Sequence, residues 1–185
     1  MKITFLGHAT LEIQINEFNL LVDPFISGNP MASEINLDDL KPDFILISHA
    51  HQDHTLDVEK LAKDNNSLII SNFEIVSHFQ SKGLNGHPMN HGGKWNFDFG
   101  ELKYVNAIHT STFPDGSNGG QPGGFIITSN NKSIYIAGDT ALTYDMKLIP
   151  INYNLDLAIL PIGDNFTMGY KDAIIASDFI ECNKI

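Results

Sequence analysis

The stretch Asp43–Asp57 holds the side chains with the clearest chemical potential, and it reads Asp-Phe-Ile-Leu-Ile-Ser-His-Ala-His-Gln-Asp-His-Thr-Leu-Asp. Its apolar run Phe44–Ile47 predicts a buried strand. Four candidate metal ligands follow that strand directly: His49, His51, Asp53 and His54. Imidazole nitrogens and carboxylate oxygens form the ligand set of zinc and similar divalent ions. The stretch therefore predicts a metal site on a loop that leaves a sheet.

One compact loop cannot easily wrap all four groups around a single small ion. The pair His49 and His51 can hold one metal, while Asp53 and His54 follow in the next turn and can reach a second. The alternative is a polar loop that is rich in His by chance. The dense spacing of the ligand types favours the metal site.

The pattern His-x-His-x-Asp-His after a buried strand is the signature of the metallo-β-lactamase superfamily, which this chain resembles. Further stretches narrow the resemblance: Leu6–Ala9, Leu21–Phe25, Asn90–Gly93, Gly138–Thr140 and Pro161–Gly169. Together they are similar to small, uncharacterised metal-dependent hydrolases related to L-ascorbate-6-phosphate lactonases. The resemblance implies an α/β fold, a four-layer αββα sandwich of the metallo-β-lactamase type with helices outside two central sheets.

The resemblance also implies which residues hold which metal. It gives the first metal to His49, His51 and His109, the second to Asp53 and His54, and the bridging position to Asp139. A carboxylate suits the bridge because each oxygen can bind one of two ions roughly 3.5–4 Å apart. We expect two divalent metal ions as cofactors, Zn²⁺ first and Mn²⁺ as the alternative.

Hydrolysis is the chemistry that such a centre supports. One Zn²⁺ can lower the pKa of a bound water from 15.7 to about 7, so a water between two dications yields hydroxide near neutral pH. That metal-bridging hydroxide would attack a small ester, lactone or phosphoester substrate. Asp53 would orient the nucleophile, and His8, which follows the first predicted strand, would be a substrate contact or a proton donor.

Other residues are expected to support the centre. Asp23 follows a predicted strand, and its carboxylate could accept the second ring N–H of a metal-bound His and so fix the tautomer of that His. The alternative is a turn that simply ends the strand with Pro24. The pocket residues that we expect are His91, Asn165, Thr167 and Met168.

Several predicted elements position these residues. Alternating patterns predict strands at Met1–Leu6 and Leu11–Ile15 and a hairpin over Trp95–Ile108. Further strands are expected at Leu20–Val22 and, as buried strands, at Leu68–Ile70 and Leu155–Leu160, with a second hairpin over Phe125–Ala137. Helical spacing predicts helices at Leu56–Lys63, Asn72–Lys82, Leu142–Ile149 and Tyr170–Glu181. Asp57 is expected to be the N-cap or an acidic residue in the first turn of the first of these helices. The last helix is expected to turn Ala173, Ile174, Ser177 and Phe179 inward. His87 is expected in a loop.

Bulk properties narrow the partners. A chain of 185 residues can form one domain, residues 1–185, and its net charge of −11 argues against nucleic acid as a partner. A small-molecule substrate remains, and it could be anionic because bound cations can dominate the field of a pocket. No apolar run approaches the roughly 18–20 residues that span a membrane. The single Cys182 and the lack of an export signal predict a cytoplasmic protein.

The sequence departs from the resemblance in one respect. Relatives continue after the last helix into a strand whose histidine completes the second metal, whereas no histidine follows His109 here. The chain is therefore expected to lack the C-terminal strand and helix, and its second site to be one protein ligand short and weaker than the first. Truncation, a water or a neighbouring subunit of a homo-oligomer would account for the gap. The alternative function is a non-catalytic or degenerate metal-binding protein of the same fold.

Overall fold

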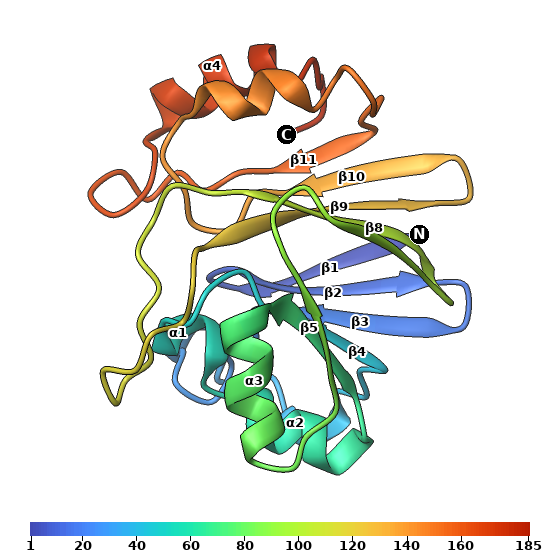
Figure 1. The fold of residues 1–185 in the computed structure, drawn as a ribbon, viewed down its shortest axis with the longest axis vertical. Coiled ribbons are helices and arrows are strands. Elements are labelled where there is room, and N and C mark those ends of the chain that lie inside the picture. Colours follow the sequence, from blue (N-terminus) through green and yellow to red (C-terminus); the bar gives the residue numbers. More distant parts are fainter. The chain divides into compact units, whose positions relative to one another are not determined.

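The computed structural model describes every residue from Met1 to Ile185, and the chain divides into two compact units. The first unit comprises Met1–Asn90 and Ser111–Gly120, and the second comprises His91–Thr110 and Gln121–Ile185. Each unit contains one β-sheet, six-stranded in the first and five-stranded in the second (Figure 1). The predicted α/β class is confirmed.

The sheet of the first unit begins with an antiparallel meander of β1 (Lys2–Gly7), β2 (Thr10–Ile15) and β3 (Phe18–Val22). It continues with three parallel strands, β4 (Phe44–Leu46), β5 (Leu68–Asn72) and β6 (Gly86–Met89). Strand β4 is the predicted buried strand, and it leads into the segment His49–His54 that carries the candidate ligands, here called the ligand loop. The placing of His87 in a loop was wrong, because His87 lies in β6. This strand carries Pro88 and lies at the edge of the sheet, where proline is tolerated.

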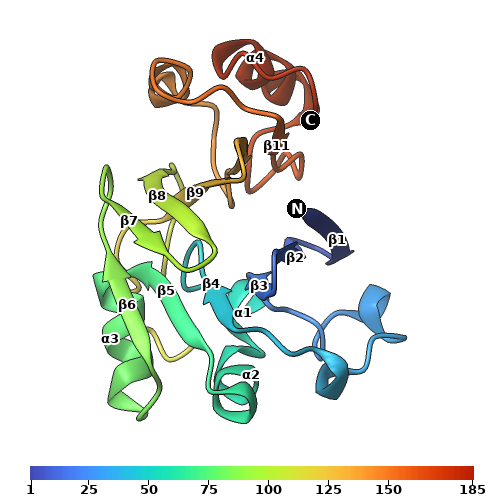
Figure 2. The same ribbon diagram turned by 90° about the vertical axis from the view of Figure 1, so that its right-hand side faces the viewer.

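The helices of the first unit are α1 (Gln52–Thr55), α2 (Val58–Asn65) and α3 (Phe73–Ser81), with short 3-10 turns η1 (Pro30–Ala32) and η2 (Leu37–Asp39). Helices α2 and α3 pack on the sheet (Figure 2), where Leu61 and Phe79 share one apolar core with Ile45. Asp57 stands at the start of α2 but makes no capping bond with its side chain. Its carboxylate instead accepts hydrogen bonds from the Ile26 amide at 2.6 Å and from the Ser27 amide and hydroxyl, which clips the preceding loop to the helix.

The sheet of the second unit consists of β7 (Lys94–Phe97), β8 (Gly100–Asn106), β9 (Gly123–Ser129), β10 (Lys132–Ile136) and β11 (Leu157–Ile159). The first four strands pair antiparallel as the two predicted hairpins, and β11 adds parallel to β10. Asn130 and Asn131 join β9 to β10 with φ angles of 53° and 59°. Two consecutive left-handed residues are typical of the type I′ hairpin turn, where Asn is favoured.

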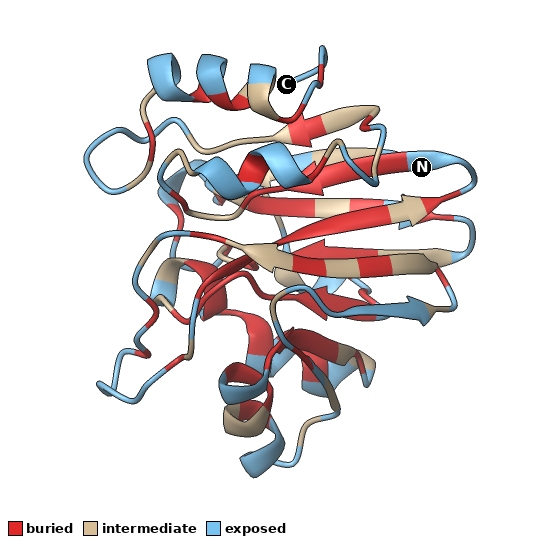
Figure 3. Ribbon diagram, turned by 45° about the horizontal axis from the view of Figure 1, so that its top comes forward, coloured by how far each residue is buried: buried red, intermediate tan, exposed pale blue.

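Two helical segments accompany this second sheet. The segment predicted as the helix Leu142–Ile149 is only a 3-10 turn, η3 (Tyr144–Leu148), whereas α4 (Tyr170–Phe179) agrees with its prediction. Ala173 is buried as expected, but Ile174 is not, since it is 60% exposed. Figure 3 shows the mixture of buried and exposed residues along this helix. The buried stripe of α4 runs through Ala176 instead, one helical turn from Ala173. None of the helices combines the length with the apolar character needed to cross a bilayer.

Candidate metal centre

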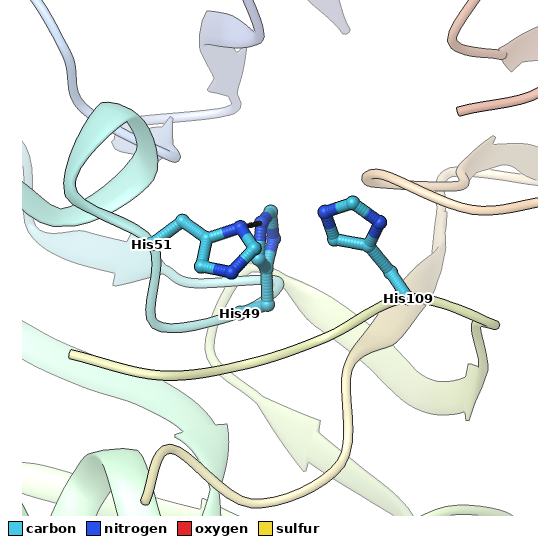
Figure 4. A group of neighbouring side chains, drawn as sticks. All are labelled: His49, His51 and His109. Atoms are coloured by element: carbon cyan, nitrogen blue, oxygen red, sulfur yellow. Dashed lines mark hydrogen bonds between the residues drawn. The ribbon is translucent and has the colours of Figure 1, made fainter. Parts of the chain in front are cut away.

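The ligand loop brings two imidazoles together in the first unit. After β4, His49 Nε2 and His51 Nδ1 lie 3.0 Å apart and are joined by a hydrogen bond (Figure 4). The other ring nitrogen of His49 lies 2.9 Å from the Ser48 hydroxyl. Two ligands at 2.0–2.1 Å from a tetrahedral zinc ion are separated by roughly 3.3 Å. The pair is therefore already spaced to hold one small ion.

A buried carboxylate orients the third histidine. Asp23 Oδ2 lies 3.0 Å from His54 Nδ1, and both side chains are buried, with 1% and 0% exposure. The same carboxylate accepts hydrogen bonds from the Ser48 amide at 2.7 Å and from the Ser48 hydroxyl at 2.6 Å. A carboxylate at Nδ1 keeps the ring proton there, so Nε2 of His54 presents its lone pair for a metal. Asp23 thus lies against a candidate ligand, where the sequence placed it.

Asp53, in helix α1, lies beside His8, which stands in the turn between β1 and β2. His8 Nε2 lies 3.1 Å from Asp53 Oδ2. The hydrogen bond from His8 is the largest of the effects that hold the pKa of Asp53 well below its usual range, and burial opposes it. Asp53 is therefore an anion at neutral pH. The ligand atoms of His8, Asp53 and His54 lie within 4.8 Å of one another.

The second unit holds the two remaining predicted ligands close together. His109 Nε2 lies 3.8 Å from Asp139 Oδ2, and both side chains are mostly buried. Thr140 fixes this arrangement, because its hydroxyl accepts the Ile108 amide at 2.9 Å. The Ala141 amide donates to the Ile108 carbonyl at 3.0 Å. Hydrogen bonds therefore join Ile108, next to His109, to the residues that follow Asp139.

A group of residues that the sequence did not single out supports the ligand loop. The amide of Ala50, between His49 and His51, donates to the Ser111 hydroxyl at 3.1 Å. Ser111 donates to the Gly119 carbonyl at 2.9 Å, and Asn72 Nδ2 donates to the same carbonyl at 2.7 Å. A Cβ atom on Gly119 would lie 2.2 Å from that of Ala50, so only glycine fits there. Asn72 caps α3, and an asparagine at the start of a predicted helix is the one sequence signal that could have identified a member of this group.

The predicted pocket residues lie in different surroundings within the second unit. His91 Nε2 lies 2.8 Å from the Pro122 carbonyl, and His91 lines a cavity of about 520 Å³. Asn165 is exposed, and Thr167 closes its loop by accepting the Gly163 amide at 3.0 Å. Met168 is 2% exposed and packs in the core, where its amide donates to the Thr140 carbonyl. A substrate contact by any of the four stays a prediction.

The donor set of the first unit fits a divalent metal. It offers four imidazoles and one carboxylate, which are ligands that zinc and manganese accept. The arrangement of His54 with Asp23 is the one that metal-binding histidines usually have. The site is also partly open, since the side chains of His8 and Asp53 are 38% and 46% exposed. An accessible position beside the ligands is what separates a catalytic site from a closed structural one.

Comparisons with known proteins agree with this chemistry. Residues 2–183 match the family described as Beta-lactamase superfamily domain. A UPF0173 metal-dependent hydrolase of Flavobacterium johnsoniae is 65% identical over 185 residues, which cover 100% of this chain and 82% of that protein. A UPF0173 metal-dependent hydrolase of Methylacidiphilum infernorum is 47% identical over 186 residues, with the same coverage of 100% and 82%.

A solved structure is also similar. Igni18, a metallo hydrolase of Ignicoccus hospitalis, matches with a TM-score of 0.87 and 30% identity, covering 97% of this chain and 78% of that one. These matches confirm the resemblance and the metallo-β-lactamase type of α/β fold, while the relation to ascorbate-phosphate lactonases stays a prediction. With the ligand loop in place and most of its length matched, the chain belongs to the beta-lactamase superfamily and, within it, to the UPF0173 metal-dependent hydrolases.

Proposed function

We propose that the protein hydrolyses a small ester, lactone or phosphoester with the help of two divalent ions, Zn²⁺ in the first place and Mn²⁺ as the alternative. One observation carries the proposal: His49 and His51 present ring nitrogens 3.0 Å apart, beside the buried pair of His54 and Asp23. This spacing of ring nitrogens, and a carboxylate that orients a neighbouring histidine, are features of divalent-metal sites. Membership of the metal-dependent hydrolases supports the same conclusion.

The ligand assignment follows the residue pattern of the superfamily. It gives the first metal to His49, His51 and His109, the second to Asp53 and His54, and the bridge to Asp139. The 3.8 Å between His109 and Asp139 supports a shared role for these two residues. The bound ions would supply Lewis acidity and an activated water to the reaction.

The chain's own residues orient and hold protons. Asp23 keeps a proton on Nδ1 of His54, which leaves Nε2 to face the metal. Asp53 stays ionised at neutral pH, so its carboxylate can accept a hydrogen bond from the attacking water and aim it at the substrate. An anionic substrate is compatible with the acidic chain, because the local charge of two dications outweighs the distant carboxylates.

Metal content and hydrolysis test the proposal together. Elemental analysis of the purified chain should find divalent metal, and the wild type should hydrolyse a member of a panel with p-nitrophenyl acetate, a γ-lactone and bis-p-nitrophenyl phosphate. A chelator should abolish that hydrolysis and Zn²⁺ or Mn²⁺ should restore it. His51→Ala should lose metal and turnover, whereas His87→Ala, on the edge strand β6, should keep both. Hydrolysis that survives both the chelator and His51→Ala would refute the proposal.

A further inference from the structure

We propose that His8 is a metal ligand, and that it forms with Asp53 and His54 a three-ligand site for a divalent cation lying wholly within the first unit. The inference rests on the proposed function and adds a ligand to its second metal. The sequence pattern gave His8 a different role, as a substrate contact or proton donor. One ring nitrogen of His8 cannot be both a metal ligand and a proton donor, because a nitrogen that binds a metal has no proton to donate.

The distances between the ligand atoms suit a shared ion. His8 Nε2 and Asp53 Oδ2 are 3.1 Å apart, close to the roughly 3.3 Å that separates two ligands of a tetrahedral zinc ion. No two of the ligand atoms of His8, Asp53 and His54 are more than 4.8 Å apart. Three ligands with one accessible side are the arrangement of catalytic zinc sites, which keep a position for water or substrate.

The backbone at His8 is held in an unusual conformation. Gly7 and His8 both have positive φ angles, 105° and 53°. Such angles are uncommon for residues other than glycine, and they persist where the surrounding structure enforces them, often at functional sites. Glycine suits position 7, because its φ of 105° lies in a region that L side chains rarely adopt. The tight turn between β1 and β2 therefore fixes the backbone position from which the His8 side chain extends.

Aromatic contacts fix the His8 ring as well. It meets the Phe25 ring edge-on with centroids 5.6 Å apart and the His54 ring edge-on at 5.1 Å. His54 is itself held by Asp23. Two of the three ligands thus have their rings set by residues outside the site. Exposed His–Asp pairs contribute little to stability. The contacts that orient the His8 and His54 rings therefore indicate more than a surface ion pair.

Metal binding by the full-length 185-residue chain separates the ligand role from the others. Two variants of His8 are compared, and both new residues adopt the left-handed backbone conformation readily. His8→Asn removes the imidazole, whereas His8→Asp replaces it with a carboxylate that can bind a metal. His87→Asn is the matched control. Binding of Co²⁺ is followed by its visible absorption and by competition with a chromophoric chelator, and thermal unfolding of the metal-free proteins confirms that each variant folds.

The expected result is a selective loss at one ion. His8→Asn should weaken the binding of one Co²⁺ at least tenfold and change its absorption spectrum while the other ion stays bound, His8→Asp should recover most of that affinity, and His87→Asn should match the wild type. A proton donor or a purely structural His8 predicts unchanged Co²⁺ affinity and spectrum. If His8→Asn binds like the wild type while His54→Asn binds weakly, the inference is wrong and the proposed function stands. If His49→Asn and His54→Asn also bind like the wild type, the proposed function itself fails.

Discussion

The backbone amide of Ala50 donates a hydrogen bond to the hydroxyl of Ser111, 61 residues later in the chain, at 3.1 Å. Ala50 is fully buried and stands between His49 and His51. Ser111 passes the hydrogen bond on to the Gly119 carbonyl, so the hydroxyl both accepts and donates. The spacing of His49 and His51 is therefore set in part by Ser111, which is not itself a candidate metal ligand.

Replacing Ser111 by alanine should loosen the ligand loop. The change leaves the buried Ala50 amide without its acceptor, which costs about 1–3 kcal/mol of unfolding free energy. Urea unfolding of the metal-free protein measures that loss, and the affinity for the metal held by His49 should fall with it. Ser117→Ala, on the exposed part of the same loop, should stay within about 0.5 kcal/mol of the wild type. Equal stability of the two variants would contradict the bracing role of Ser111.

Asp23→Asn should weaken metal binding at His54. The amide has one oxygen, while the Asp23 carboxylate serves the Ser48 amide, the Ser48 hydroxyl and His54 Nδ1 together. Loss of such a supporting carboxylate typically lowers metal affinity 10–100-fold. Chelator competition gives the affinity, and Asp39→Asn on the exposed turn η2 provides the control. An Asp23→Asn protein with the affinity of the Asp39→Asn protein would exclude this role for Asp23.

Thr140→Val should loosen the arrangement of His109 and Asp139, the two candidate ligands of the second unit. Valine has nearly the shape of threonine but cannot accept the Ile108 amide, and Thr140 is fully buried. The unpaired amide costs about 1–3 kcal/mol, and His109 and Asp139 lose their common anchor. Chemical denaturation measures the stability, with Thr4→Val on β1 as the matched change. The prediction does not survive if Thr140→Val is as stable as Thr4→Val.

His78 should make stability depend on pH. Its ring stacks on Phe113 with centroids 3.9 Å apart, and burial, followed by the charge of Lys82, lowers its pKa. The unfolded chain, with an ordinary histidine pKa near 6.5, therefore takes up this proton more readily than the folded one. Stability from His78 is complete above about pH 6.5 and declines as the pH falls below that value.

The variant His78→Phe keeps the stacked ring and removes the titration. Between pH 7.5 and 5.5 the wild type should lose more unfolding free energy than His78→Phe, by less than about 1.4 kcal/mol for each unit of pKa difference. Urea unfolding at both pH values, with chelator present, supplies the comparison. Identical pH dependence of the two proteins would show that His78 titrates alike in the folded and unfolded states.

The ligand loop could be predicted because its information is local. Phe44–Ile47 is a continuous apolar run, and the candidate ligands follow it without a gap, so the strand and the ligand types after it can both be identified in one stretch. The hairpin of β9 and β10 was predictable for the same reason, from alternation on either side of two asparagines. Strand β6 was not, because Pro88 and the mixed residues around it show no strand pattern and only pairing with β5 makes it one.

The residues that support the centre could not be predicted from the sequence. Asp57 fits the start of a helix, yet its carboxylate binds amides 30 and 31 residues earlier in the chain. Ser111 and Gly119 carry no motif, and their role exists only because the loop folds back onto Ala50. Long-range hydrogen bonds of this kind depend on tertiary packing, which no local pattern encodes.

The segment Ser111–Gly120 is part of the first unit, although the chain on both sides of it belongs to the second. A gene cut after Asn90 would therefore encode a first half without the loop that holds Ala50 in place. Exchanging residues 1–90 alone with those of a relative would combine residues 49–54 of one protein with the Ser111–Gly120 segment of another. A split or permuted version built in the laboratory would keep the Ser111 hydroxyl on the Ala50 amide only if these ten residues stay with the amino-terminal half.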